Sequence, residues 1–177
     1  MAPDTTLNET GADAENLIAK AKVYAPHAIA VIASIVFLDS LRFKFTNAPE
    51  TQVIFGRLND WAASLGAEGL FAHTGLFSQY VIGTAELFAA SLLLLGIVPA
   101  FRRLQAVGAL IAFAVMSGAV NFHLWTPLGI DPNNDGGGLF MMAVIVWFTS
   151  ALLVFIRRRE LAAIFSGLRA TLFPARQ

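Results

Sequence analysis

The chain contains no cysteine among its 177 residues. This absence excludes disulfides, thiol redox chemistry, cysteine-ligated iron–sulfur clusters and cysteine-based zinc sites. Charged residues are also scarce, at 14% of the sequence, and twelve basic residues are balanced by twelve acidic ones. A chain without net charge lacks the basic surface with which proteins bind nucleic acid, so we expect no nucleic-acid partner.

Two further kinds of site are missing. The sequence holds neither a Gly-x-Gly-x-x-Gly nor a Walker pattern, so no phosphate-binding loop is expected. A haem held between two histidines is not expected either, because His27 and His123 should differ in depth by roughly 20 Å at the rise of a helix. We therefore predict neither a haem nor an iron–sulfur cluster, although axial ligation by a single histidine stays open.

Apolar residues are what the sequence has in abundance, at 56%. Soluble domains are nearer half apolar, so this composition favours a membrane protein. Four stretches approach the roughly 17–25 residues that a helix needs to cross a bilayer. These predicted spans are residues 24–41, 80–100, 104–125 and 138–156. We predict an all-α, polytopic membrane protein whose four transmembrane helices form a bundle within residues 24–156.

The basic residues predict the orientation of this bundle. With four spans, nine of the twelve basic residues fall at one end of it: Lys20, Lys22, Arg102, Arg103, Arg157, Arg158, Arg159, Arg169 and Arg176. The positive-inside rule then places both termini in the cytoplasm. We expect a multi-pass protein of the bacterial inner membrane, with a cytoplasmic segment at residues 1–23 and a basic, amphipathic cytoplasmic tail at 157–177. The first 22 residues are acidic and lack an apolar core, so we expect no cleaved signal peptide.

The first outer loop contains a further helical pattern. From Pro49 to Leu65, apolar residues recur at helical spacing, and Gly66 follows as a stop signal. We predict an amphipathic helix that lies on the outer membrane interface.

One carboxylate, Glu86, interrupts the second span. A charge in hydrocarbon costs roughly 2.5–3.5 kcal/mol on insertion scales, so Glu86 should face protein, a cation or water. It lies roughly 9 Å below the outer end of its helix at the helical rise. The other polar residues that the bundle could bury gather in the same outer third, whereas the inner halves of the spans are almost purely apolar. These residues are Asp39, Arg42, Lys44, Asn121 and His123.

The convergence of these residues predicts a polar cluster. We expect Glu86 to pair with Arg42 or Lys44, with His123 or Asn121 as hydrogen-bonding neighbours. Proton handling or ligand binding is one interpretation of the cluster. An ion pair that only fixes the register of the helices is the other.

The loop before the last span resembles half of a calcium site. Asp131, Asn133 and Asp135 occupy the first, third and fifth positions of a calcium-binding loop. The twelfth position, where the closing glutamate would be, is Met142. We therefore expect a turn here rather than a metal site.

Several motifs together suggest a family. They are FLDSLRFKF at the end of the first span, IGTAELFAASLLLLG in the second, NFHLW at the end of the third, and a small-residue-rich entry to the fourth. From about Ile35 to Ile156 the chain resembles the DoxX-like family of small four-span membrane proteins. In this resemblance, Lys44 is equivalent to a lysine in the turn after the first span, Glu86 to a glutamate of the second, and His123 to a polar position ending the third.

The resemblance implies a link to electron transport. One branch of the family resembles DoxD, a membrane subunit of thiosulfate:quinone oxidoreductase. The fold is thought to be similar to the four-helix core of vitamin K epoxide reductase, which handles quinones. That enzyme needs cysteines, which this chain lacks, so the chain cannot reduce a quinone by that route.

Two functional hypotheses follow, and whether the chain is an enzyme stays open. In the first, a quinone head group binds in the outer pocket beside Glu86 and His123, and electrons come from a partner. In the second, the chain is an accessory subunit of a larger respiratory or photosynthetic membrane complex and performs no chemistry. Both expect the lipid bilayer and other membrane subunits, or further copies of the chain, as partners. A small transporter is a weaker third hypothesis, because four spans would have to oligomerise to form a path.

Overall fold

The computed structural model describes residues 5–173, and every regular element in that range is a helix. The helices are α1 (Thr5–Phe45), α2 (Pro49–Ser64), α3 (Gln79–Leu95), the short 3₁₀ helix η1 (Pro99–Phe101), α4 (Arg102–Trp125), α5 (Gly138–Ile156) and α6 (Arg158–Leu172). The predicted all-α fold is confirmed for this part of the chain. The N-terminal segment is helical from Thr5 and continuous with the first predicted span.

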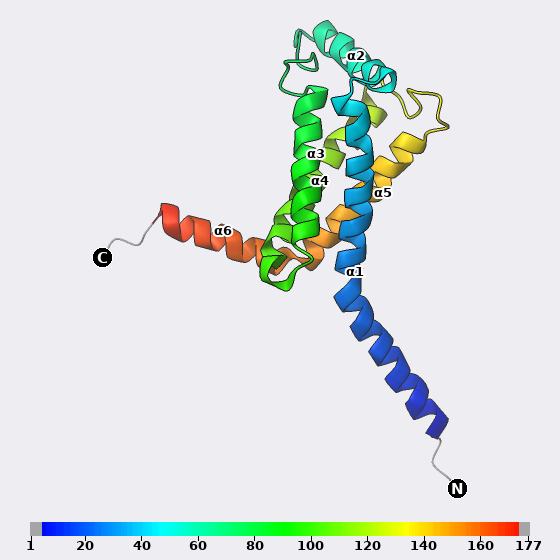
Figure 1. Cartoon of the computed structure of the whole chain (residues 1–177), viewed down its shortest axis with the longest axis vertical. Helices are drawn as coiled ribbons and strands as arrows, with labels where there is room; N and C mark the ends of the chain where they lie inside the picture. The colour runs from blue at the N-terminus through cyan, green and yellow to red at the C-terminus, as the bar shows by residue number, and fades with distance from the viewer. Residues whose placement is uncertain (1–4, 174–177) are drawn as a thin grey trace.

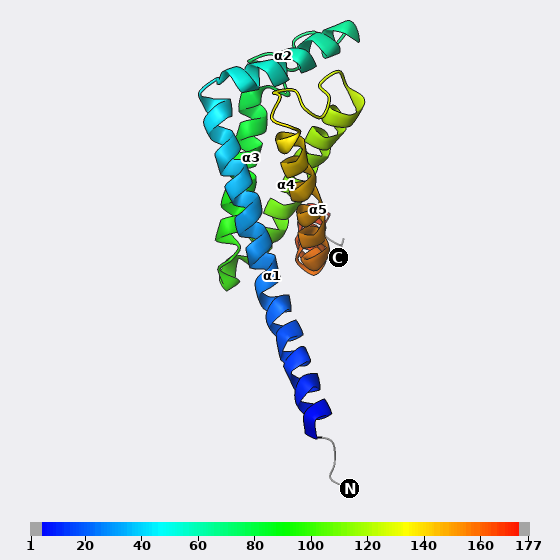
Figure 2. The ribbon, with the colours of Figure 1, turned by 90° about the vertical axis from the view of Figure 1, so that its right-hand side faces the viewer.

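Four helices, α1, α3, α4 and α5, pack side by side and alternate in direction (Figure 1). Helix α2 lies across one end of this bundle, and α6 leaves the opposite end (Figure 1). The N-terminal part of α1 extends beyond the bundle on the same side as α6 (Figure 2). We refer to these two ends of the bundle as the α2 end and the α6 end.

Three segments are long and apolar enough to cross a membrane. They are residues 13–45 of α1, residues 99–125 of η1 and α4, and α5. Helix α3 is also apolar but has only 17 residues. By the length and composition of its helices, the chain is a membrane protein.

The second predicted span, residues 80–100, is longer than the helix that forms. Helix α3 ends at Leu95, and Val98 is extended before Pro99, as a residue that precedes proline usually is. Gly96 packs directly on the start of α4. A Cβ at Gly96 would lie 2.3 Å from both the backbone nitrogen and the Cβ of Gln105. The chain then turns, and Pro99 begins η1 at a position where a missing N–H costs nothing.

Small side chains hold the bundle together. The core contains these buried residues from all four helices: Ala30, Ala33, Phe37, Ala89, Ala90, Leu93, Ala109, Ala112, Met116, Ala143, Val146 and Leu153. Alanines and glycines let helix backbones approach closely in a membrane, where apolar burial alone does not drive association. At Gly108 the approach is so close that a Cβ would lie 2.8 Å from the backbone nitrogen of Leu93.

Helix α2 confirms the helix predicted for the first loop. It starts at Pro49 after an extended Ala48, and Gly66 follows its end in a left-handed conformation with φ of +82°. A second apolar cluster, made of Leu58, Ala62, Phe71 and Leu128, fixes α2 over the bundle.

The α6 end is less apolar than predicted. Gln105 of α4 is fully buried there, and its side-chain oxygen accepts a hydrogen bond of 2.8 Å from Nε of Arg157. Arg157 also lies 3.6 Å from a carboxylate oxygen of Glu160, one turn further on. The expectation that the inner halves of the helices carry almost no polar groups is therefore wrong at this position, because Gln105 and Arg157 bury each other.

Candidate functional site at the α2 end

The α2 end of the bundle contains a cavity of about 910 Å³. Its walls come from α1, α3, α4 and α5, and its roof comes from α2 together with residues of the two loops that precede α3 and α5. Most of the side chains that line it are apolar. We call this space the main cavity.

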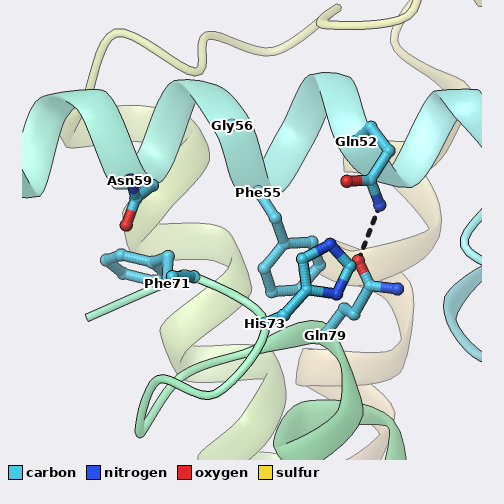
Figure 3. Close-up of a pocket in the computed structure, with 8 residues that line it drawn as sticks. Gln52, Phe55, Gly56, Asn59, Phe71, His73 and Gln79 are labelled. Carbon is cyan, nitrogen blue, oxygen red and sulfur yellow. Dashed lines mark hydrogen bonds between the residues drawn. The ribbon is translucent and has the colours of Figure 1, made fainter. Parts of the chain in front are cut away.

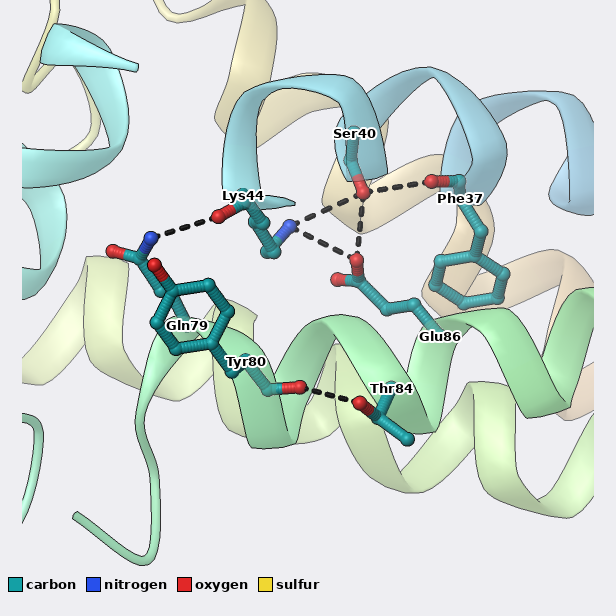
Figure 4. A network of polar contacts seen from close by, with 7 residues as sticks. All are labelled: Phe37, Ser40, Lys44, Gln79, Tyr80, Thr84 and Glu86. Carbon is teal, nitrogen blue, oxygen red and sulfur yellow. Dashed lines mark hydrogen bonds and ion pairs between the residues drawn. The ribbon is translucent and has the colours of Figure 1, made fainter. Parts of the chain in front are cut away.

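A buried ion pair forms part of the cavity wall (Figure 4). The Lys44 ammonium lies 2.9 Å from Oε2 of Glu86, and the Ser40 hydroxyl donates to the same oxygen at 2.6 Å. The side chains are 16% and 4% exposed for Lys44 and Glu86. Hydrogen bonds to a charged oxygen are shorter and roughly twice as strong as neutral ones, which fits this tight geometry.

Lys44, and not Arg42, pairs with Glu86, because only Lys44 lies on the face of α1 that packs against α3. Ser40 and Lys44 are four residues apart on α1 and therefore share one face, which looks toward α3. Arg42 lies on the other side of the helix and pairs instead with Asp39 at 2.9 Å. Both members of that second pair are well exposed, at 68% and 58%, although Asp39 also lines the main cavity.

Hydrogen bonds of the Gln79 side chain hold the end of α1 in place. Gln79, at the start of α3, donates from Nε2 to the backbone carbonyl of Lys44 at 2.7 Å and to Oδ1 of Asn47 at 3.0 Å. Its own oxygen accepts a hydrogen bond of 2.8 Å from Gln52 of α2. Sequence analysis missed Ser40, Gln52 and Gln79; only the spacing of Ser40 from Lys44 could have indicated one of them.

His123 also lines the main cavity, but it makes no hydrogen bond with Glu86. Its Nδ1 lies 2.6 Å from the backbone carbonyl of Gly129. A carbonyl only accepts, so Nδ1 of His123 carries a proton and donates in this contact. The prediction that His123 or Asn121 bonds to Glu86 is wrong, because Asn121 is exposed and donates to the backbone carbonyl of Ser117 at 2.7 Å.

The acidic loop before α5 uses its carboxylates to bind its own backbone. Asp131 accepts from the backbone N–H of Asp135 at 2.8 Å. Asp135 in turn accepts from the N–H groups of Gly137 at 3.0 Å and Leu139 at 2.8 Å, so it caps the start of α5. Asn133 and Asp135 line the main cavity. Among the side chains of residues 13–173, no group of three or more histidines, aspartates or glutamates has an arrangement that suits a metal.

This capping makes the first turn of α5 sensitive to pH. The hydrogen bond from the Leu139 N–H is the largest cause that holds the pKa of Asp135 below its ordinary value. A lowered pKa in the folded state means that the cap stabilises α5 above the unfolded-state pKa and is lost as the pH falls through the folded-state pKa. We expect hydrogen-exchange protection of the Leu139 amide, corrected for intrinsic rates, to fall over that range.

An Asp135→Asn variant should lose this pH dependence, because an amide oxygen accepts hydrogen bonds but does not titrate in this range. Asp60→Asn, which removes an exposed carboxylate of α2, is the matched control and should keep the dependence. Protection that stays constant in the wild type as the medium is acidified would contradict the capping role.

A second, smaller cavity of about 230 Å³ lies between α2 and the loop before α3 (Figure 3). Gln52, Asn59, His73 and Gln79 contribute its polar groups. Phe55 and Phe71 line both this cavity and the main one. None of the site residues predicted from the sequence lines the smaller cavity, so the main cavity is the candidate site.

No family model, curated protein or solved structure matches this chain. The DoxX-like assignment therefore stays a prediction that rests on the sequence motifs.

Proposed function

We propose that the chain is a DoxX-like integral membrane protein of an electron-transport system and binds a quinone in the main cavity. The observation that carries the proposal is a largely apolar cavity whose wall contains the buried Lys44–Glu86 pair and His123. Binding sites for small molecules typically have volumes of about 300–1,000 Å³ and apolar walls with a few placed polar groups. The main cavity, at about 910 Å³, has both properties.

The polar groups suit a quinone head group. The Lys44 ammonium can donate to a quinone carbonyl. Oε1 of Glu86, which makes no hydrogen bond with residues 13–173, can accept from a quinol hydroxyl. Phe43 of α1 and Phe122 of α4 add aromatic surface to the cavity lining. A bound quinone would supply two-electron redox chemistry. Because the chain has no cysteine, we propose that the electrons come from a partner chain.

We further propose that α1, α3, α4 and α5 all cross the bacterial inner membrane, with α2 on its outer interface. A helix of 17 residues is at the lower limit of the roughly 17–25 that a span needs, so the bilayer would be thinnest beside α3. The alternating directions of the four helices and the arginines at the α6 end support cytoplasmic termini.

Quinone affinity of two carboxylate variants tests this function. Glu86→Gln should weaken binding of a benzoquinol by about tenfold or more, because it removes a charged acceptor, and such hydrogen bonds contribute about 1.5–3 kcal/mol. Asp39→Asn changes a carboxylate that also lines the cavity but is exposed and paired with Arg42, so it should leave affinity within about twofold. Calorimetry on the purified protein in detergent measures both, and equal affinities for the two variants would contradict the proposal.

The segments that extend beyond the bundle favour a second function, that of an accessory subunit. The N-terminal part of α1 and helix α6 both extend away from it (Figure 1), and both carry exposed apolar side chains such as Leu17, Phe165 and Leu168. These surfaces support an accessory subunit that docks on other membrane chains. Stoichiometric partner chains without any quinone in the purified native protein would favour this function over the first.

A further inference from the structure

We infer that the main cavity takes a long-tailed amphiphile that enters from the hydrocarbon core of the bilayer, through an opening between α1 and α5. The inference rests on the proposed function and deepens it, because it specifies the class of quinone and the route. The ligand would be a quinone with a long alkyl or isoprenoid tail rather than a water-soluble one.

The opening follows from the way the two helices cross. Helices α1 and α5 approach each other toward the α6 end and separate toward the α2 end, as both views show (Figures 1 and 2). Residues of both helices line the main cavity along this gap. Several of them are also exposed: Ile35 at 61% on α1, and Met142 at 39% and Leu139 at 36% on α5. Exposed lining residues on both facing helices mark an opening between α1 and α5.

Helix α2 covers part of the cavity at the α2 end (Figure 2). Thr51 and Leu58 of that helix are buried residues of the cavity wall. Leu58 packs with Phe71 and Leu128 in the apolar cluster that fixes α2 in place. This cluster restricts entry beneath α2, whereas the mouth between α1 and α5 faces the region that lipid tails occupy beside two helices long enough to span.

The cavity is polar at one end and apolar at the other. Ser40, Lys44, Glu86 and His123 are at the α2 end, while the walls nearer the middle of the bundle are apolar. Along α4, Ala114 lies nine residues before His123 and thus about 13 Å deeper. An amphiphile with its head beside Glu86 would extend its tail along this apolar wall to the mouth.

Blocking the mouth should slow association. We would follow a tritiated benzoquinone with a decyl tail binding to the full chain in lipid nanodiscs. Ile35→Trp should lower the association rate by about tenfold, because a bulkier side chain narrows the route by which the ligand enters. Ile32→Trp is the matched control: Ile32 is 50% exposed, is one turn away on α1 and does not line the cavity.

Met142→Trp with its control Ile145→Trp repeats the test from α5, so the result does not depend on one variant folding. Ile145 is 42% exposed and lies outside the cavity lining. Unchanged association in both Ile35→Trp and Met142→Trp would overturn lateral entry while leaving the proposed function intact. If the wild type binds no decyl-benzoquinone at all, the proposed function and this inference both fail.

The position of the tail can be measured in the same nanodiscs. A benzoquinone whose decyl tail ends in a diazirine should label peptides of α1 around Ile35 and of α5 around Met142 after illumination, and excess unlabelled quinone should suppress the labelling. Labelling confined to α2 and the loops would overturn the assigned tail direction.

Discussion

Lys44→Met is expected to lower the free energy of unfolding by about 3–5 kcal/mol, the usual cost of removing one partner of a buried ion pair. The substitution keeps most of the apolar stem of Lys44 but leaves the Glu86 carboxylate, which is 4% exposed, with only the Ser40 hydroxyl as a bonded partner. Reversible unfolding of the purified protein, by steric trapping in detergent micelles, measures the effect.

Two further variants test whether the loss of stability comes from breaking the buried pair or only from removing a positive charge. Arg42→Met removes a cation two residues away, but its pair with Asp39 is exposed, so a change of about 0.5 kcal/mol or less is expected. Combining Lys44→Met with Glu86→Leu should recover much of the lost stability, because an apolar pair of similar volume avoids the cost of burying charge. If Lys44→Met is no more destabilising than Arg42→Met, the ion pair is not buried as described.

Gly96→Ala should lower stability by about 3 kcal/mol, the upper end of the range for overpacking. The added methyl would lie 2.3 Å from the backbone nitrogen of Gln105 and 2.6 Å from its Cα. These are backbone atoms at the start of α4, so relief requires α3 and α4 to move apart. The same unfolding measurement applies.

Gly56→Ala is the matched control for this substitution. Gly56 is in α2, and a Cβ there would meet nothing within 4 Å. Removing a glycine from the interior of a helix should raise stability by about 0.5–1 kcal/mol. The close contact between α3 and α4 would be contradicted by a Gly96→Ala protein as stable as the wild type.

The helices were largely predictable because their signals are local. Helix α5 begins and ends at the predicted residues, Gly138 and Ile156, where a run of apolar residues is bounded by a glycine-rich turn and by arginines. Helix α2 was bounded by Pro49 and Gly66. The predicted second span, residues 80–100, ran past the end of α3 at Leu95, although Gly96 and Pro99 are local signals that a helix ends. The close contact of Gly96 with Gln105 was not predictable, because Gln105 belongs to the next helix.

The site was predictable only in part. The apolar surroundings of Glu86 in the sequence and its predicted depth identified it as a buried charge. The sequence left both Arg42 and Lys44 as possible partners, because it does not show which face of α1 packs against α3. The role of His123 was missed because its partner is a backbone carbonyl, that of Gly129, in a loop with a left-handed glycine. Such contacts depend on the path of a loop, for which the sequence contains no periodic signal.

Native mass spectrometry of the chain extracted from its own membranes tests the central claim most directly. That claim is that the main cavity, with Glu86 and Lys44 on its wall, holds one quinone. The account predicts one long-tailed quinone per chain on the wild-type protein and its loss from Glu86→Gln, with occupancy counted per folded chain because the variant also breaks the buried pair with Lys44. A wild-type protein that carries stoichiometric partner chains and no quinone would contradict it.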